Sequence, residues 1–286
     1  MNIQWYPGHM TKARRAMQED LKLVDAIVEL RDARIPYSSS NPDLAELGKG
    51  KMRIIVFSKA DMADPAVTEV WVRLLTEEGC RVVSMDARNG KEAKAVLGAL
   101  NQAAEEKRAR DRKRGIKNRP LRLMVVGIPN VGKSTLINSL AGRASAKTGD
   151  KPGVTKGRQW IRLSASLELL DTPGILWPKF EDETVGQNLA LIGSVNEEVL
   201  ERTELAVIGF ARLKERCPER IKEIYGLEEE DPYDFLEALA RRQAILKKGG
   251  EADTERTAMR FLDDLRKGKL GRLSLEVPKE QHEERE

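Results

Sequence analysis

The segment 127–134, GIPNVGKS, is the feature that most constrains the fold of this chain. It follows the apolar run RLMVVG at 122–127 and precedes a helical pattern from Lys133 to about Ala141. The pattern G-x-x-x-x-G-K-[ST] between a strand and a helix is typical of a loop whose backbone N–H groups turn inward to bind phosphate. A glycine-rich turn with a chance Lys-Ser pair is the alternative. We therefore expect an α/β unit built around a phosphate-binding loop.

The residue types in and after this loop predict a magnesium nucleotide site. We expect Lys133 to reach the β- and γ-phosphates and the Ser134 hydroxyl to bind Mg²⁺. Downstream, Asp171 and Gly174 belong to D-T-P-G at the end of the apolar run LELLD, where Asp171 would hold Mg²⁺ through water and the Gly174 N–H would contact the γ-phosphate. Thr155, in the turn-rich loop TGDKPGVTKG, would complete the metal shell; a plain loop threonine is the alternative. The other loop residues assigned to nucleotide binding are Asn130, Val131, Gly132 and Thr135.

A second motif precedes the phosphate loop. Residues 58–61, S-K-A-D, follow the apolar run RIIVF and are similar to the N-K-x-D motif with which GTPases read guanine. We expect Asp61 to accept hydrogen bonds from guanine N1–H and the 2-amino group, and Lys59 to cover the base and brace the phosphate loop. Ser58 replaces the usual asparagine, so nucleotide binding should be weaker while guanine preference persists. The stretch DARNG at 86–90 loosely matches S-A-K-x-G, which assigns Asp86 and Ala87 to the base, with the Ala87 N–H on guanine O6.

The order of these motifs predicts a circularly permuted GTPase sheet. Apolar runs of strand length alternate with helical patterns, which is typical of a doubly wound, mainly parallel sheet. From Pro178 onward the strand signal fades, and PYDFLEALARRQAILKKGG carries a helical pattern up to Gly249-Gly250. We expect a GTPase domain at 1–177, with an N-terminal arm at 1–23 and a basic linker at 107–120, and a helical domain at 178–286 with a frayed acidic tail. The expected strands are 24–30, 53–57, 81–85, 122–127, 159–164 and 167–171, and the helices before the linker are 10–23, 42–49, 65–78 and 91–108.

Charge and composition narrow the class further. The chain has 286 residues, of which 34% are charged and only 5% aromatic, and its formal net charge is +4. Residues 107–119 hold eight basic side chains against one acid, which is typical of a solvated linker or a nucleic-acid contact. No apolar stretch approaches the roughly 20 residues that span a bilayer, and the first residues lack the apolar core of a secretory signal. We expect a cytoplasmic protein without a membrane partner; its two cysteines and two histidines have no metal-binding spacing.

The chain resembles the ribosome biogenesis GTPase A family of circularly permuted, YlqF-type GTPases. The resemblance rests on WYPGHM, DARIP, SKAD, GIPNVGKSTLIN, KTGDKPGVT and LLDTPGILWPKFED, and it covers nearly the full length. It implies a GTPase that binds GTP and GDP and acts late in assembly of the large ribosomal subunit. It implies binding of the pre-subunit, its rRNA and ribosomal proteins, in the GTP form, with release after stimulated hydrolysis. Family members with asparagine in the phosphate loop tend to use K⁺, which makes Asn130 a potassium candidate.

One residue complicates the mechanism. Ile175 stands where Ras-like enzymes carry the glutamine that orients the attacking water, and its side chain has no polar atom. His9, in the Pro-Gly turn that we expect from YPGHM, is our candidate for orienting that water beside Lys133 and Thr155. The alternative is a packed N-terminal arm in which His9 is a cap or an RNA contact.

Other classes remain open at this stage. One is a GTP-regulated RNA-binding factor with a non-ribosomal partner, and another is a passive rRNA-binding assembly protein. An ATPase or small-molecule kinase is disfavoured by Asp61, because adenine offers no matching pair of donors. Basic residues of the helical domain, interspersed with acids, are either an ordinary charged surface or phosphate contacts to rRNA. The basic residues of the helical domain are Arg241, Arg242, Lys247, Lys248, Arg256, Arg260, Arg266, Lys267 and Arg272.

For the oligomeric state, a monomer is the default expectation.

Overall fold

The computed structural model describes residues 7–85, 90–116, 119–142, 159–172, 182–195, 201–228 and 231–278, with the backbone alone at 7–14, 45 and 90–92. These residues form two compact units. One unit holds the described residues up to 172 together with 276–278, and the other holds those from 182 to 275. In these described ranges, no helix combines the length and the apolar character that a membrane span requires.

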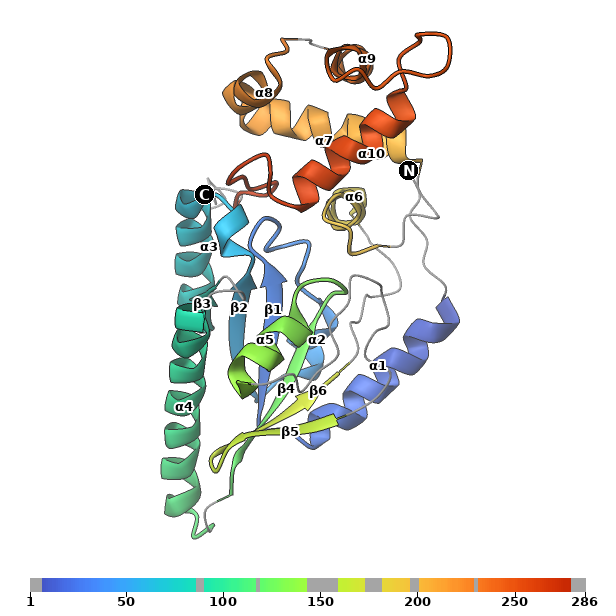
Figure 1. Ribbon diagram of the computed structural model, residues 1–286. Coiled ribbons are helices and arrows are strands. Elements are labelled where there is room, and N and C mark those ends of the chain that lie inside the picture. Colours follow the sequence, from blue (N-terminus) through green and yellow to red (C-terminus); the bar gives the residue numbers. More distant parts are fainter. Residues whose placement is uncertain are drawn as a thin grey trace, which may run out of the picture. The chain divides into compact units, whose positions relative to one another are not determined.

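The first unit is built on a six-stranded sheet in the order β3-β2-β1-β4-β6-β5 (Figure 1). Neighbouring strands are parallel except for the antiparallel pair β5 and β6. The predicted α/β class is confirmed, and each strand lies where an apolar run predicts it. The sheet joins β1 to β4, although most of the unit's helices lie between these strands in the sequence. The strands are β1 Ala26–Asp32, β2 Met52–Ser58, β3 Arg81–Ser84, β4 Leu121–Gly127, β5 Gln159–Ser164 and β6 Leu167–Asp171.

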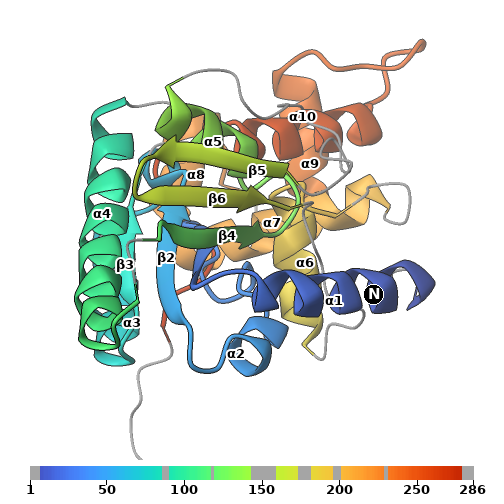
Figure 2. The ribbon, with the colours of Figure 1, turned by 90° about the horizontal axis from the view of Figure 1, so that it is seen from below.

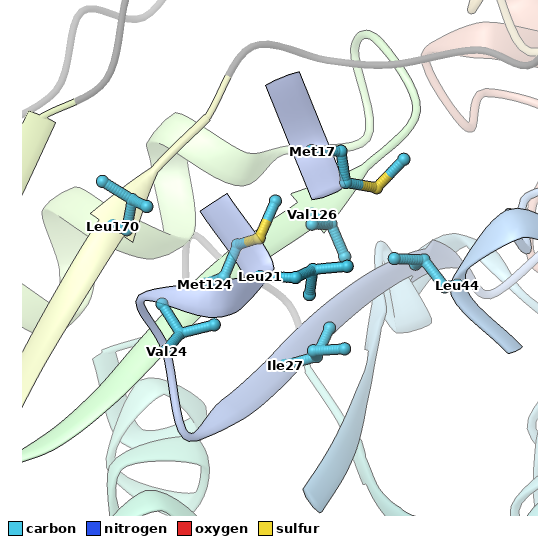
Figure 3. Close-up of a cluster of buried hydrophobic side chains, with 8 residues drawn as sticks. All are labelled: Met17, Leu21, Val24, Ile27, Leu44, Met124, Val126 and Leu170. Atoms are coloured by element: carbon cyan, nitrogen blue, oxygen red, sulfur yellow. The ribbon is translucent and has the colours of Figure 1, made fainter. Parts of the chain in front are cut away.

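Helices cover both faces of this sheet, as the doubly wound pattern predicts. On one face, Met17 and Leu21 of the first helix pack against Met124, Val126 and other side chains from three strands (Figure 3). The third helix packs on the same face of β2, whereas the fourth and fifth helices contact each other and the opposite face. Figure 2 shows α1 and α5 on opposite sides of β4 and β6. The helices are α1 Pro7–Lys22, α2 Asp43–Leu47, α3 Pro65–Glu77, α4 Gly90–Lys113 and α5 Lys133–Ala141, with a 3-10 turn at Ala60–Met62.

Two helices of this unit differ from their predicted extent. The first helix begins at Pro7, so the expected Pro-Gly turn around His9 is wrong. The backbone N–H groups of a first helical turn have no partner within the helix. Proline, which lacks this N–H, therefore fits the first position of a helix. The side chain of His9 lies outside the described residues. The fourth helix continues through Lys113, so the first half of the predicted basic linker is helical. An ion pair between Lys107 and Asp111, one turn apart, supports this extension.

The second unit is helical, which confirms the expectation for the C-terminal region. Three of its helices begin at aspartate N-caps whose side chains accept backbone N–H bonds, and two have proline at the first position. The aromatic rings of Phe210 and Phe235 stack with centroids 3.7 Å apart, and Phe261 approaches Phe235 edge-on. These contacts form the core of the unit. Its helices are α6 Glu183–Leu191, α7 Arg202–Arg216, α8 Pro218–Tyr225, α9 Pro232–Arg242 and α10 Thr254–Arg266.

The predicted continuation of α9 to Gly249-Gly250 is wrong. The helix ends at Arg242, because Ala244 adopts a left-handed conformation with φ of 53°. The Ile245 N–H then bonds the Ala240 carbonyl (2.8 Å) and the Ala244 N–H bonds the Arg241 carbonyl (3.1 Å), which is a Schellman motif. Ile245 is the buried hydrophobic residue that follows this cap. Its apolar side chain therefore fits the helical pattern in the sequence although the residue lies beyond the helix.

The chain returns to the first unit at Glu276. The Glu276 carboxylate accepts hydrogen bonds from the backbone N–H groups of Tyr37 (2.8 Å) and Ser38 (3.1 Å) and from the Ser38 hydroxyl. The Trp71 indole N–H donates to its backbone carbonyl at 3.4 Å. Residues 276–278 are therefore anchored beside the loop that follows β1.

Candidate nucleotide-binding site

The predicted functional segments meet at the carboxyl ends of the parallel strands. Asp32 at the end of β1 is in register with Ser58 at the end of β2, and Leu30 is in register with Gly127 at the end of β4. Asp171 ends β6 beside Val125. In open α/β sheets, ligands bind outside this edge. The base-reading segment, the phosphate loop and the D-x-x-G aspartate thus lie together although they are far apart in sequence.

The phosphate loop has the backbone shape that its glycines predict. Gly132 has φ of 101° and Asn130 has φ of 58°, both left-handed conformations that turn the chain tightly. Gly132 is the N-cap of α5 and supplies no side chain to the helix end. The first N–H groups of α5 therefore have no side-chain cap, as a phosphate-binding helix end requires. Val131 is buried beneath the loop, and Ser134 and Thr135 are half-buried in the first helical turn.

Lys133 and Asp171 form the charged centre of this loop. Lys133 is 8% exposed, and its Nζ donates to the carbonyls of Gly127 (3.0 Å) and Ile128 (2.9 Å). Burial lowers the pKa of Lys133 to about 8, against the opposing effect of the Asp171 charge. Burial also raises the pKa of Asp171, which Lys133 and the Thr172 backbone N–H partly offset. Each charge offsets part of the cost of burying the other, so an incoming ligand that carries both signs of charge would stabilise both groups.

The donor set fits Mg²⁺ at Asp171. Its Oδ1 is buried and has no hydrogen-bond partner within the described ranges. A buried carboxylate oxygen of this kind needs a cation or a water bound to one. Ser134 stands at the N-terminus of the helix that faces the same edge. The other predicted metal and γ-phosphate residues, Thr155 and Gly174, and Ile175 lie outside the described residues.

The predicted base-reading segment, residues 58–61, is held by β1. Ser58 is buried, and its hydroxyl donates to the Arg31 carbonyl at 3.2 Å. The ammonium of Lys59 lies 3.0 Å from Asp32 Oδ2 at the end of β1, whereas its expected contact with the phosphate loop stays a prediction. A buried carboxylate is a stronger acceptor for an ammonium than a loop carbonyl is. Asp61 lies half-buried in the 3-10 turn that follows.

Of the second predicted base-reading segment, residues 86–90, the structure describes the residue before it, Met85, and the backbone of Gly90. Asp86 and Ala87 lie outside the described residues, but the preceding Met85 is fixed to the first segment. Its N–H donates to the Phe57 carbonyl (2.8 Å), and its carbonyl accepts from the Ala60 N–H (3.3 Å). The chain therefore enters 86–90 directly beside Ser58 and Lys59.

Sequence reasoning missed Asp32 and Arg34. Both are buried at this edge, and the guanidinium of Arg34 makes two hydrogen bonds to the Asp32 carboxylate (2.8 and 2.9 Å). The available signal was DARIP, an acid and a base two residues apart directly after a buried strand. This pattern indicates a charged pair at a strand end, but it does not reveal which segment the pair supports.

Together, a mainly parallel sheet, a phosphate loop after β4 and a Ser-Lys-x-Asp segment after β2 define a circularly permuted P-loop GTPase. The family profile described as 50S ribosome-binding GTPase matches residues 122–235. The chain is 47% identical to Ribosome biogenesis GTPase A of Priestia megaterium over 98% of both chains, and 36% identical to that of Thermotoga maritima over 97% and 95%.

Solved structures agree with these relatives. The GDP-bound structure of TM YlqF matches with a TM-score of 0.69 at 32% identity, covering 92% of this chain and 99% of that one. GNP-bound YlqF from T. maritima matches with a TM-score of 0.67 at 33% identity, covering 94% and 99%. This chain belongs to the ribosome biogenesis GTPase A family, and it is a GTPase.

Proposed function

We propose that this GTPase acts in late assembly of the large (50S) ribosomal subunit in the cytoplasm. It binds the pre-subunit in its GTP state and leaves after the particle stimulates hydrolysis. The buried Lys133–Asp171 pair beside an uncapped helix N-terminus is the observation that supports GTP chemistry at this edge. Family membership and the description of the matching profile support the ribosomal partner. We take 1–177 as the GTPase domain and the region 178–286 as the rRNA-binding domain, except that residues 276–278 return to the GTPase unit.

In this proposal the nucleotide lies across the carboxyl ends of the parallel strands. The diphosphate occupies the loop 127–134, where backbone N–H groups and Lys133 bind its oxygens. Lys133 also stabilises negative charge on the transferred phosphoryl group. Asp61 reads guanine, Lys59 covers the base, and Ser58, Asp86 and Ala87 complete the pocket around it.

Ser134, Thr155 and Asp171 would hold Mg²⁺, which supplies charge neutralisation to the phosphate oxygens when bound. The buried Asp171 Oδ1 without a partner in the described ranges supports this ligand set. Asn130 would contribute its side-chain oxygen to K⁺, and its left-handed backbone brings it to the loop's tight turn. The Gly174 N–H would contact the γ-phosphate.

His9 is proposed to orient the attacking water, because Ile175 has no polar side-chain atom. His9 lies in the first turn of α1. Replacing it with alanine should abolish most particle-stimulated hydrolysis and leave GDP binding unchanged. The matched control is His282→Ala, which removes the only other histidine of the chain. Unchanged stimulated turnover in His9→Ala would remove His9 from the mechanism.

The deciding experiment measures GTP hydrolysis with and without purified large ribosomal subunits, in K⁺ and in Na⁺, with ATP as control. We expect slow turnover that rises many-fold with the subunits and requires guanine. If the subunits change nothing while GTP is still hydrolysed, the ribosomal role fails and a GTP-regulated factor with another partner takes its place. If nucleotide binds without turnover under every condition, a passive rRNA-binding protein is the better description.

A further inference from the structure

Asp32 is a buried carboxylate that binds two cations at once. Arg34 donates to Oδ1 from its backbone N–H (3.1 Å) and Nε (2.9 Å), and to Oδ2 from Nη2 (2.8 Å). The Lys59 ammonium lies 3.0 Å from the same Oδ2. Burial alone would raise the pKa of Asp32, but the charges of Arg34 and Lys59 hold it well below its usual range. The carboxylate therefore stays ionised and holds both cations at neutral pH.

Lys59 adopts a backbone conformation that needs external support. Its φ is 55°, in the left-handed region that is unfavourable for a residue with a side chain. Such a residue persists where its surroundings fix it. Here the Ala33 N–H donates to the Ser58 carbonyl (2.9 Å), and Asp32 binds the Lys59 head group. Both restraints come from the end of β1, so β1 helps to set the shape of the segment after β2, together with the Met85 carbonyl that binds the Ala60 N–H.

Arg34 fixes the Asp32 carboxylate in place. The guanidinium is 1% exposed, and a buried cation requires compensating negative charge. Burial lowers the pKa of Arg34, whereas Asp32 and, more weakly, Asp61 raise it. Two cations, Arg34 and Lys59, thus stand against two carboxylates, Asp32 and Asp61. Asp61 is the carboxylate proposed to read guanine, and it lies in the 3-10 turn whose N-cap is Lys59.

We infer that Asp32 is a positioning residue for guanine selectivity that acts through Lys59, with Arg34 holding the Asp32 carboxylate in place. In the usual motif an asparagine bridges the base-reading segment to neighbouring loops. Among the described residues, the Ser58 hydroxyl is seen to donate to the Arg31 carbonyl, and the buried Asp32–Arg34 pair supplies a further brace. The inference rests on the proposed assignment of 58–61 to base reading.

The test compares GDP, IDP and ADP binding by calorimetry on the full-length chain. Inosine lacks the 2-amino group that Asp61 would bind, whereas the diphosphate contacts are common to all three ligands. The ratio of the IDP to the GDP dissociation constant therefore reports the position of Asp61. The variant is Asp32→Asn and the matched control is Glu29→Gln. Glu29 is equally buried on β1, but its ion-pair partners are Arg31 and Arg53 and none lies in 58–61.

We expect the wild type to prefer GDP over IDP about tenfold or more, the value of a hydrogen bond to a charged group. Asp32→Asn should weaken GDP binding about tenfold and bring the ratio close to one, whereas Glu29→Gln should keep the wild-type ratio. In a Lys59→Met background, Asp32→Asn should add less than about threefold, because the two residues act through one contact. If Asp32→Asn does not fold by circular dichroism, Asp32→Glu keeps the charge, displaces the carboxylate and should show the same loss of selectivity.

An unchanged ratio in a folded Asp32 variant would overturn the inference, as would an equal loss in Glu29→Gln. Full additivity with Lys59→Met would exclude action through Lys59. A wild type that does not distinguish GDP from ADP would instead refute the proposed base-reading site itself.

Discussion

Lys133 and Asp171 show how burial and charge oppose each other at single residues. Burial brings the pKa of the lysine to about 8 and raises that of the aspartate, and the mutual attraction only partly restores each. Both groups gain from a ligand that brings phosphate to one and a cation to the other. The charges of the phosphate loop are therefore only partly compensated without a ligand. For this reason the affinity for nucleotide should depend on pH.

GDP affinity should fall as the pH rises from 7 to 8.5. Phosphate binds the charged form of Lys133, and a free-protein pKa of about 8 means that most of the lysine is neutral at pH 8.5. Linkage then predicts about fourfold weaker binding at pH 8.5 than at pH 7. Calorimetry across this range checks the slope, and Lys133→Met serves as the control that lacks the titrating group. An equal slope in Lys133→Met would assign the effect to another group.

Gly127→Ala should destabilise the fold and impair nucleotide binding. A Cβ at Gly127 would lie 2.8 Å from the Leu30 carbonyl oxygen of β1 and 3.0 Å from Val131 Cγ1, so the strand end must shift. Overpacking of this kind costs about 1–3 kcal/mol. Urea denaturation and GDP binding measure both effects. Gly98→Ala is the matched control: it is exposed in α4 with no atom within 4 Å, and should stabilise by up to about 1 kcal/mol.

The sequence was informative about residues whose role depends on local spacing. The phosphate-loop pattern alone predicted that Gly132 and Lys133 would sit between a strand and a helix, and the structure has them there. The contact between Lys59 and Asp32 depends on the register of two parallel strands joined by a helix. Periodicity does not specify that register, so the brace of the base-reading segment could be found only from the structure.

At the scale of elements, the hydrophobic pattern of the sequence predicts whether a segment is a helix or a strand better than it predicts where the segment ends. All six strands and the helices between them were predicted, because buried parallel strands are uninterrupted apolar runs. The end of α9 was missed, since Ala244 occupies a cap position where glycine is the usual signal. The end of α4 was missed because a dense block of charge resembles a linker, although Lys107 and Asp111 stabilise it as a helix.

The turn after α9 should contribute to ribosome binding. Lys247 and Lys248 are exposed at its tip, where the Lys247 N–H bonds the Glu251 carbonyl (2.8 Å) and Leu246 bridges Ala252. Replacing both lysines with glutamate should weaken binding to large subunits and reduce the salt slope by about two, one for each lost phosphate contact. Sedimentation binding at several salt concentrations measures this, while intrinsic GTP hydrolysis should be unaffected.

The control for this prediction is Lys22→Glu with Lys49→Glu, which makes the same charge change at two exposed lysines of the first unit. Equal loss of binding in both double variants would indicate a general charge effect and exclude a specific contact at the turn.

At the scale of the whole molecule, the permuted order predicts where the chain tolerates a break. A GTPase in the usual order would begin at β4 and end at α4, and here those elements are joined by the linker after Gly115. Both sides of the linker are fixed independently of it. On the α4 side, the Lys107 ammonium lies 4.0 Å from the Asp25 carboxylate. On the β4 side, Arg119 pairs with Asp25, and the Asp25 N–H bonds the Arg122 carbonyl at 2.8 Å. The covalent connection should therefore be dispensable for the folded sheet.

A protease site inserted between Gly115 and Arg119 tests this expectation. After cleavage, the two fragments should co-elute in gel filtration and bind GDP within about threefold of the intact protein, because the β1–β4 pairing survives. Separate elution of the fragments would show that the linker holds the sheet together. The uncleaved insertion protein is the control for the inserted residues.

The same permuted order has a consequence during synthesis. The central strand β1 leaves the ribosome with β2 soon after it, but its other neighbour, β4, follows almost a hundred residues later. At a synthesis rate of about 5–20 residues per second, the edge of β1 that pairs with β4 stays unpaired for about 5–20 seconds. In the folded protein β1 is buried along its whole length. An unpaired apolar edge is prone to wrong pairing in that interval. The nascent chain of this GTPase is thus most in need of chaperone protection before its phosphate loop exists.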